Sequence, residues 1–304
     1  MDIYLLNDLL KYASIPFTVS ALLPTSGQRR AYLGSFEQTK PAVLKITSTN
    51  ESVVARIQRE IRILSSLDSK YFPKVYHFAY VTKENIADYI DHLIQDKRSD
   101  IPNVSPFFYT VEEYIENIGW EKALPVIRGE SEFIGFMSRM FEALALLWEK
   151  HVVHRDIKPD NILIKASMDP VIIDLGIARS FQAGTKDLTA MFFQTPCTPQ
   201  FAAPEQLLNK KDEITYKSDQ FAMGVTAFYL LTGKFPYGSM EEDGVDVVLR
   251  NMHEGQLDSF DSVPFINKDL FEFVLRLLAV QPFKRFRTSQ DINTALTAIR
   301  GMRP

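Results

Sequence analysis

The stretch from His151 to Ile164, HVVHRDIKPDNILI, constrains this chain more than any other. Two valines lead into a polar turn that holds an acid, two cations and an amide, and an apolar run leads out. A short polar segment between apolar ones predicts chemistry carried on a loop between rigid elements. A plain charged turn between two strands is the alternative interpretation.

The polar turn resembles the catalytic loop of eukaryotic-type serine/threonine protein kinases, because the pattern H-R-D-x-K-x-x-N is matched at every fixed position. The resemblance implies that Asp156 accepts the proton of the substrate hydroxyl and that Lys158 stabilises charge on the transferring phosphoryl group. It implies that Asn161 binds magnesium, a hard cation that prefers oxygen ligands. Lysine at position 158 marks the serine/threonine class, so the expected acceptor is a Ser or Thr hydroxyl of a protein.

The bulk composition narrows the class of protein. With 46% hydrophobic and 24% charged residues, the chain of 304 residues can bury a sizeable core and suits a two-lobed unit with little left over. A formal net charge of -4 without a long basic run argues against nucleic acid as a partner. No apolar run approaches the ~18 residues of a membrane span, so we expect no membrane association and a cytoplasmic location. The single cysteine, Cys197, excludes an intrachain disulfide.

A lysine and a glutamate in the first third of the chain fit the same family. The apolar run AVLKI at 42–46 predicts a strand and resembles the family's V-A-I-K motif, which implies that Lys45 holds the α- and β-phosphates of the nucleotide. Residues 51–67 carry apolar side chains at helical spacing, with Glu60 beside the apolar face. The resemblance implies that Glu60 pairs with Lys45. Taken alone, Lys45 is equally well a solvated edge residue. For Glu60, an ordinary exposed helix acid is the alternative interpretation.

The glycine-rich loop that covers the phosphates in this family is poorly matched. Its three glycine positions fall on Pro24, Ser26 and Arg29, and the nearby Gly27 is out of register. Glycines there let backbone amides approach phosphates closely, so their loss predicts a weaker phosphate cradle. Arg29 and Arg30 either replace those amides with guanidinium contacts or are simply solvated.

The resemblance assigns further positions to the adenine of the nucleotide. Ala31 and Val43 correspond to the apolar residues above the ring, and Leu163 corresponds to the floor beneath it. Backbone groups of Glu113 and Ile115 are expected to bond the adenine edge. An ordinary core leucine at 163 would look the same.

Glu112 is unusual at its position. It would guard the back of the adenine site, where a medium-sized apolar residue is more common in the family. A carboxylate removed from bulk water is costly unless it is paired. We therefore expect Glu112 to contact a cation or a water molecule.

Two predicted helices depart from a minimal member of this family. Residues 1–15 predict a short N-terminal amphipathic helix. Residues 82–106 predict a helical insertion with an apolar stripe at Ile86, Ile90, Leu93 and Ile94. The insertion either covers the small lobe, which we favour, or provides a partner or regulatory surface.

The run VIIDLG at 171–176 is an apolar strand that ends in an acid, a bulky residue and a glycine. It resembles the family's D-F-G motif with leucine in place of phenylalanine. The resemblance implies that Asp174 binds the magnesium that bridges the nucleotide phosphates and that Gly176 permits a sharp turn. Asp174 follows Asn161 by thirteen residues (174 minus 161), in the family's order.

The segment 177–200 is polar, rich in hydroxyl groups, and corresponds to the activation loop. Thr189 and Thr195 are the candidates for self-phosphorylation, since added negative charge there could pair with Arg155 and order the loop. An activation loop that is ordered without phosphate is the alternative.

Three positions are expected to have structural duties. The run Ala203-Pro204-Glu205 resembles the family's A-P-E motif, and Arg285 matches the arginine that pairs with its glutamate. Asp219 matches an aspartate that caps backbone amides of the catalytic loop.

Together these matches predict an α+β, two-lobed protein kinase-like fold, with a small antiparallel β lobe holding one main helix and a large, mostly α-helical lobe. The expected boundaries are 16–113 for the small lobe, 114–116 for the hinge and 117–304 for the large lobe. The expected function is transfer of the γ-phosphoryl group of ATP to a protein, with Mg2+ as cofactor and Mn2+ as the alternative ion. The rival functions are a nucleotide-binding pseudokinase or scaffold, suggested by the poor glycine loop, and a kinase of small molecules.

Overall fold

The structure, a computed structural model, describes residues 3–24, 29–48, 54, 57–58, 61–63, 65–95, 105–174, 199–258 and 268–301, and for Arg29 the backbone alone. Glu60, Gly176, Thr189 and Thr195 lie outside the described residues. The chain divides into two compact units, Met1–Asp68 with Pro73–Ile115, and Ser69–Phe72 with Glu116–Pro304. The break after Ile115 falls within the segment predicted as the hinge.

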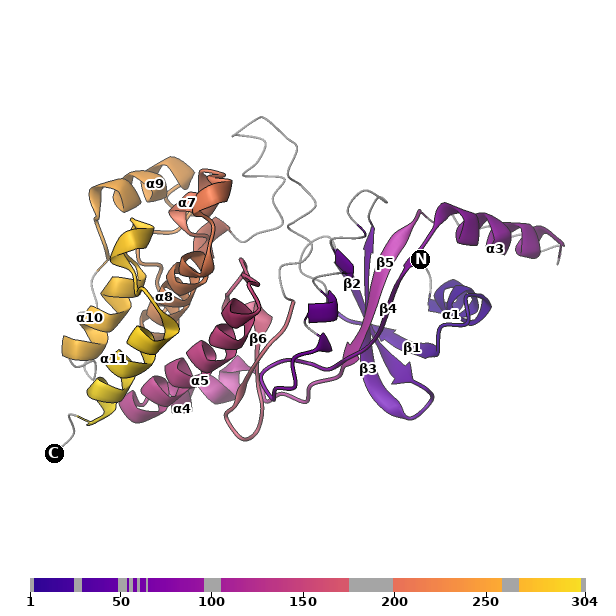
Figure 1. Cartoon of the computed structure of the whole chain (residues 1–304), viewed down its shortest axis with the longest axis horizontal. Helices are drawn as coiled ribbons and strands as arrows, with labels where there is room; N and C mark the ends of the chain where they lie inside the picture. Colours follow the sequence, from indigo (N-terminus) through magenta and orange to yellow (C-terminus); the bar gives the residue numbers. More distant parts are fainter. Residues whose placement is uncertain are drawn as a thin grey trace. The chain divides into compact units, whose positions relative to one another are not determined.

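The first unit is built on an antiparallel sheet with the strand order β1-β2-β3-β5-β4 (Figure 1). Its strands are β1 (Phe17–Leu22), β2 (Arg29–Phe36), β3 (Lys40–Ser48), β4 (Val75–Val81) and β5 (Phe107–Glu113). Burial alternates along β3, with Ala42, Leu44 and Ile46 buried and Val43 and Lys45 only partly so. Because successive strand side chains point to opposite faces, Val43 and Lys45 share the face turned away from Leu44.

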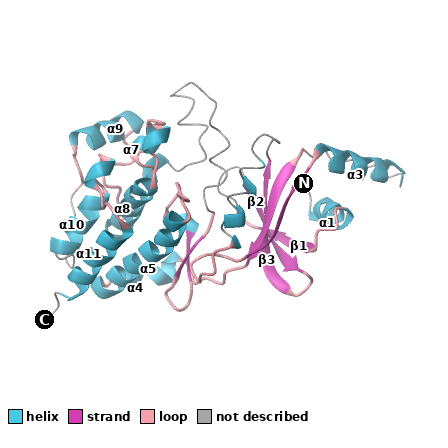
Figure 2. Ribbon diagram, in the orientation of Figure 1, coloured by secondary structure: helices cyan, strands magenta, loops and turns pink. Residues whose placement is uncertain are grey.

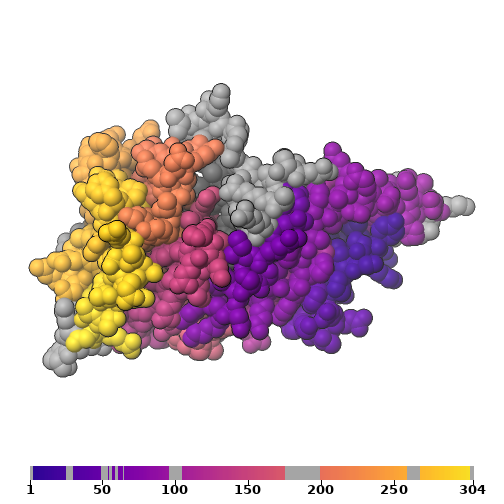
Figure 3. Space-filling model, in the orientation of Figure 1, coloured from indigo at the N-terminus to yellow at the C-terminus, as the bar shows by residue number. Residues whose placement is uncertain are grey.

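Two helices, α1 (Ile3–Tyr12) and α3 (Lys83–Gln95), share a hydrophobic core with the Leu44 face of the sheet. The Tyr89 hydroxyl of α3 donates a hydrogen bond to a carboxylate oxygen of Asp8 in α1 at 3.0 Å. The Tyr12 and Tyr89 rings pack with their centroids 5.4 Å apart. The atoms of α1, in indigo, lie against those of α3, in purple, in Figure 3. The described part of the insertion therefore covers the sheet, as favoured from the sequence.

The apolar stripe predicted for this insertion was wrong in one position and missed another. Ile94, which we expected in the stripe, is 52% exposed, whereas Tyr89 is 1% exposed. The buried set is Ile86, Tyr89 and Leu93. These residues follow i, i+3, i+7 spacing, so they line one side of the helix. The tyrosine can be buried because Asp8 accepts a hydrogen bond from its hydroxyl.

Asn7 of α1 occupies the open edge of the sheet at β1. Its Oδ1 accepts a hydrogen bond from the Val19 N–H at 2.7 Å, and its Nδ2 donates to the Val19 carbonyl at 3.1 Å. Because β1 is an outer strand, these two bonds satisfy backbone groups that no neighbouring strand reaches.

The second unit is mostly helical, as Figure 2 shows, with one short hairpin. Its elements are α4 (Trp120–Ile127), α5 (Glu130–Glu149), η1 (Pro159–Asn161), β6 (Ile162–Ile164), β7 (Pro170–Ile172), η3 (Pro199–Phe201), α7 (Pro204–Leu207), η4 (Lys211–Glu213), α8 (Tyr216–Thr232), α9 (Val245–Glu254), α10 (Lys268–Leu277), η5 (Pro282–Lys284) and α11 (Ser289–Gly301). Helices α5 and α8 carry the long buried stretches, which include Phe136, Met140, Phe221 and Phe228. The predicted fold class, α+β with an antiparallel β unit and a mostly helical unit, is confirmed.

The segment predicted as the main helix of the small lobe, 51–67, is helical at each described residue from 54 to 65. Ile57 and Ile61, both 2% exposed, form its buried side. Across the described residues, no helix has the length and apolar character needed to span a membrane.

Candidate functional site

The polar turn around Asp156 is tied to α8 by one buried carboxylate. Asp219, in the first turn of α8, accepts hydrogen bonds from the backbone N–H groups of His154 at 2.9 Å and Arg155 at 2.8 Å. The indole N–H of Trp148 donates to the same carboxylate at 2.9 Å. Arg155 has a left-handed backbone with φ of 67°, so these bonds hold the turn in a conformation that a non-glycine residue rarely adopts.

The environment of Asp219 changes its acidity. Burial raises the pKa of its carboxyl to about 6, and the three N–H donors act in the opposite direction by favouring the charged form. The same carboxyl group is therefore both the anchor of the turn and a group that titrates just below neutral pH.

His154 links the turn to Ile173, the residue directly after strand β7. Its ring is fully buried, with Nδ1 accepting the backbone N–H of Asp156 at 3.2 Å. Because Nδ1 is an acceptor, the ring proton is on Nε2, which lies 3.3 Å from the Ile173 carbonyl. From the sequence, no role was expected for His154 beyond its place in the motif.

The hairpin of β6 and β7 brings Asn161 and Asp174 together. Ile162 pairs with Ile172, and the Ile173 N–H donates to the Asn161 carbonyl at 2.9 Å, so Asp174 follows directly on the residue bonded to Asn161. The Asn161 side-chain N–H donates to the Asp156 carbonyl at 2.7 Å. The amide oxygen of Asn161 is thus the atom of that side chain suited to a cation.

Lys158 lies beside the predicted base. Its ammonium is 3.9 Å from a carboxylate oxygen of Asp156, and the two side chains are 8% and 13% exposed. The second unit therefore places Asp156, Lys158 and Asn161 on one turn, with the backbone of Asp174 next to the residue bonded to Asn161. These are the four residues predicted for phosphoryl transfer. Among the described residues there is no group of three or more His, Cys, Asp or Glu side chains that could hold a metal ion.

In the first unit, the face of the sheet turned away from α1 and α3 carries Ala31, Val43 and Lys45. Ala31 is paired with Lys45, and Val43 lies two residues from Lys45 on the same strand and face. The Lys45 ammonium forms an ion pair with Glu112 at 2.8 Å. Glu112 therefore has the cation that its position required, and this partner was not identified from the sequence.

Glu113 and Ile115 lie at the end of β5. The Glu113 N–H donates to the Lys74 carbonyl at 2.8 Å. The carbonyl of Glu113 is therefore the backbone group of this residue that could accept a hydrogen bond from an adenine edge. Ile115 is 4% exposed. In the second unit, Leu163 is partly exposed between the buried residues Ile162 and Ile164.

Glu205 and Arg285 form a buried ion pair in the second unit. The guanidinium donates to both carboxylate oxygens, at 2.6 and 3.0 Å, and Ser218 donates to Glu205 at 2.8 Å. The next residue, Gln206, accepts the Ala203 N–H at 3.2 Å and donates to the Arg155 carbonyl at 3.0 Å. Gln206 thus connects this region to the turn, which no sequence pattern had indicated.

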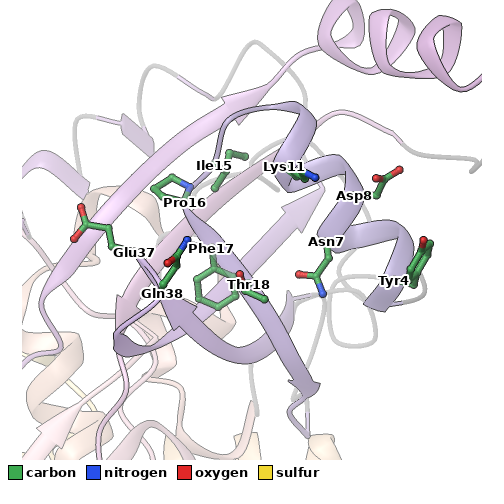
Figure 4. A pocket seen from close by; sticks show the side chains of 10 residues that line it. All are labelled: Tyr4, Asn7, Asp8, Lys11, Ile15, Pro16, Phe17, Thr18, Glu37 and Gln38. Atoms are coloured by element: carbon green, nitrogen blue, oxygen red, sulfur yellow. The ribbon is translucent and has the colours of Figure 1, made fainter.

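The first unit also has a cavity of about 700 Å³ between α1, β1 and the β2–β3 turn (Figure 4). Its lining includes Tyr4, Lys11, Phe17 and Glu37. None of the predicted site residues lines it. The chemistry indicated by the sequence therefore lies elsewhere.

Comparison with known proteins gives one family. The family described as "Protein kinase domain" matches residues 35–296. Serine/threonine-protein kinase PrkC of Bacillus subtilis is 26% identical over 266 residues, which are 85% of this chain and 36% of the relative. Serine/threonine-protein kinase D of Synechocystis is 24% identical over 268 residues, 86% of this chain and 46% of the relative. The chain thus spans between about a third and a half of the length of these relatives.

Proposed function

Because the chain belongs to the protein kinase domain family, we propose that it is a serine/threonine protein kinase that transfers the γ-phosphoryl group of ATP to a protein hydroxyl. Membership of the family implies a phosphotransferase that uses ATP and Mg2+ and acts on protein substrates. The relatives named above are serine/threonine kinases, which supports a Ser or Thr acceptor.

One observation carries the proposal. The side-chain amide of Asn161 is bonded to the backbone of Asp156, while the hairpin ladder joins Asn161 to the residue before Asp174. An acid, an amide oxygen and a second acid are therefore held on one framework. This arrangement suits a reaction in which the protein mainly positions groups and stabilises charge.

In the proposed mechanism, Asp156 accepts the proton of the substrate hydroxyl as the hydroxyl oxygen forms a bond to the γ-phosphorus. The bond from this phosphorus to the β–γ bridging oxygen breaks at the same time, and ADP leaves. Lys158, held near Asp156, stabilises negative charge on the transferring group. Asn161 and Asp174 supply oxygen donors, the ligand type that Mg2+ prefers, so the residues present fit this ion. When bound, Mg2+ would neutralise charge on the phosphates.

The remaining roles concern the nucleotide. Lys45 would hold the α- and β-phosphates, and Glu60 would pair with Lys45. Ala31, Val43 and Leu163 would contact the adenine faces. The carbonyl of Glu113 and the N–H of Ile115 would bond its edge.

The proposal includes regulation of activity by phosphorylation of the activation loop. Thr189 and Thr195 are its candidate phosphorylation sites, with Arg155 as the cation for the added charge. Mass spectrometry of the protein after incubation with ATP would identify the modified residues. Modification confined to other segments would remove these two threonines as regulatory sites.

The test is transfer of radiolabel from ATP with Mg2+, to the protein itself or to a generic basic protein, by the wild type and by Asp156→Asn. We expect the variant to lose about 10²–10⁴-fold in rate with its fold intact, since a positioned base contributes that much. Equal transfer by both proteins would remove Asp156 as the base. If both are stabilised against heat by Mg·ATP but neither transfers phosphate, the protein is a pseudokinase.

A further inference from the structure

Glu112, Lys45 and Thr110 form a connected group on one face of the sheet. The Lys45 ammonium lies 2.8 Å from Oε2 of Glu112. The Thr110 hydroxyl donates to Oε1 of the same carboxylate at 2.7 Å. Both carboxylate oxygens therefore have a protein partner.

The strand register explains why these side chains meet. Lys45 of β3 is directly opposite Thr110 of β5, and Val43 is opposite Glu112. Lys45 and Glu112 are thus diagonal neighbours on one face, a separation that long side chains bridge. Thr110 lies two residues before Glu112 on the same strand, so its hydroxyl can fix the carboxylate from the side.

This ion pair is shielded from water. The Lys45 and Glu112 side chains are 11% and 16% exposed, whereas the Lys40–Glu37 pair of the same unit, at 2.7 Å, has side chains 51% and 53% exposed. Charges attract more strongly where water is largely excluded. An anion that approaches Lys45 must therefore share or displace the carboxylate that already holds its ammonium.

We infer that Glu112 is a positioning residue that acts through Lys45. It holds the ammonium against β5 and competes with nucleotide phosphates for it, so it weakens nucleotide binding. The inference rests on the proposed function, which assigns the phosphates to Lys45. It identifies Glu112, a residue to which the family resemblance gave no charge partner, as a determinant of nucleotide affinity.

The inference is tested by a double-mutant cycle on the Kd of Mg·ATP, measured by titration calorimetry on the full chain. Glu112→Gln keeps the shape and removes the charge, and should tighten binding about tenfold, the scale of one hydrogen bond to a charged group. The same substitution in the Lys45→Met background should change the Kd by less than about twofold, because the competition no longer exists. Steady-state kinetics should show the change in the KM for ATP and not in kcat.

Three further variants control the cycle. Glu112→Asp retains the charge and should fall between the wild type and Glu112→Gln. Thr110→Val removes only the hydroxyl that orients the carboxylate, and should tighten binding by a smaller factor in a protein whose two charges are unchanged. Glu37→Gln removes the charge of the exposed pair and should leave the Kd at its wild-type value.

The inference is overturned if Glu112→Gln leaves the Kd unchanged or weakens binding. Equal tightening in the Lys45→Met background would overturn it too, since it would mean simple repulsion between Glu112 and the phosphates. Failure of the proposed function gives a different result. In that case the wild type binds Mg·ATP without transferring phosphate, and the binding cycle still decides the role of Glu112.

Discussion

The guanidinium of Arg285 donates hydrogen bonds to both carboxylate oxygens of Glu205, a residue eighty positions earlier in the chain. Both side chains are almost completely excluded from solvent, at 0% and 1% exposure. The other N–H groups of Arg285 donate to the carbonyls of Lys217, Ala279 and Val280. The pair therefore joins α7, the start of α8 and the segment after α10.

Arg285→Met should destabilise the protein by about 3–5 kcal/mol, because it leaves the Glu205 carboxylate buried without a cation. Urea denaturation followed by circular dichroism measures the change in the free energy of unfolding. Lys40→Met, which breaks the exposed Lys40–Glu37 pair, is the matched control and should leave the denaturation midpoint unchanged. A midpoint for Arg285→Met equal to that of the control would contradict the structural role.

The stability of the protein should depend on the protonation of Asp219. Its pKa is raised by burial to about 6 in the folded state from 3.8 in the unfolded chain, so the folded state binds the proton more tightly. The corresponding stabilisation is complete below about pH 4 and is lost as the pH rises through about 6. The free energy of unfolding of the wild type, minus that of Asp219→Asn, should decrease by about 3 kcal/mol from acid to neutral pH. A difference that stays constant with pH would argue against titration of this group.

Substitution of two adjacent residues can test which side of α3 is buried. Leu93 is 1% exposed and Ile94 is 52% exposed. Leu93→Ala should lower the free energy of unfolding by about 2–5 kcal/mol, because it leaves a cavity in the core that α1, α3 and the sheet share. Ile94→Ala should change the stability by no more than about 0.5 kcal/mol. Equal losses from the two substitutions would restore the stripe predicted from the sequence.

Asp174→Asn should raise the Mg2+ concentration needed for half-maximal phosphate transfer by at least about tenfold, because it removes a charged oxygen ligand. Titration of activity with Mg2+ at fixed ATP gives this value. Asp160→Asn alters an exposed carboxylate next to Asn161 and should leave the Mg2+ dependence unchanged. An identical curve for Asp174→Asn and the wild type would exclude Asp174 as a ligand.

Periodicity predicted the local structure well. The strand predicted at 42–46 is part of β3, and the helix predicted within residues 1–15 is α1, since both patterns are set by neighbouring residues in the chain. The stripe of α3 was misjudged because an isoleucine is expected in a core and a tyrosine is not. The carboxylate of Asp8, 81 residues away in the chain, accepts the hydrogen bond of the Tyr89 hydroxyl and so favours the burial of this side chain.

In the candidate site, too, some features could be predicted from the sequence and others depend on contacts between distant parts of the chain. Its motif residues were expected from the family resemblance, and so were two of their contacts, the Glu205–Arg285 pair and the hydrogen bonds of Asp219 to backbone amides. Other contacts could not be predicted from the sequence. The contact between Lys45 and Glu112 depends on the pairing of β3 with β5, which are separated in sequence by β4 and α3. The link from Gln206 to Arg155 depends on tertiary packing in the same way.

The hydrogen bonds between Asn7 and Val19 bear on where the N-terminus of this protein can be truncated. The family match begins at residue 35, inside β2, so a chain trimmed to that boundary would lose α1, β1 and most of β2. Removing α1 alone would expose the backbone of Val19. It would also expose the core side chains that now pack against Leu6, Leu9 and Leu10 of α1. Such a chain would present a bare strand edge to its own copies and should self-associate, which sedimentation would reveal. We therefore expect the smallest piece that stays folded and monomeric to include α1 and β1, which lie before the family match.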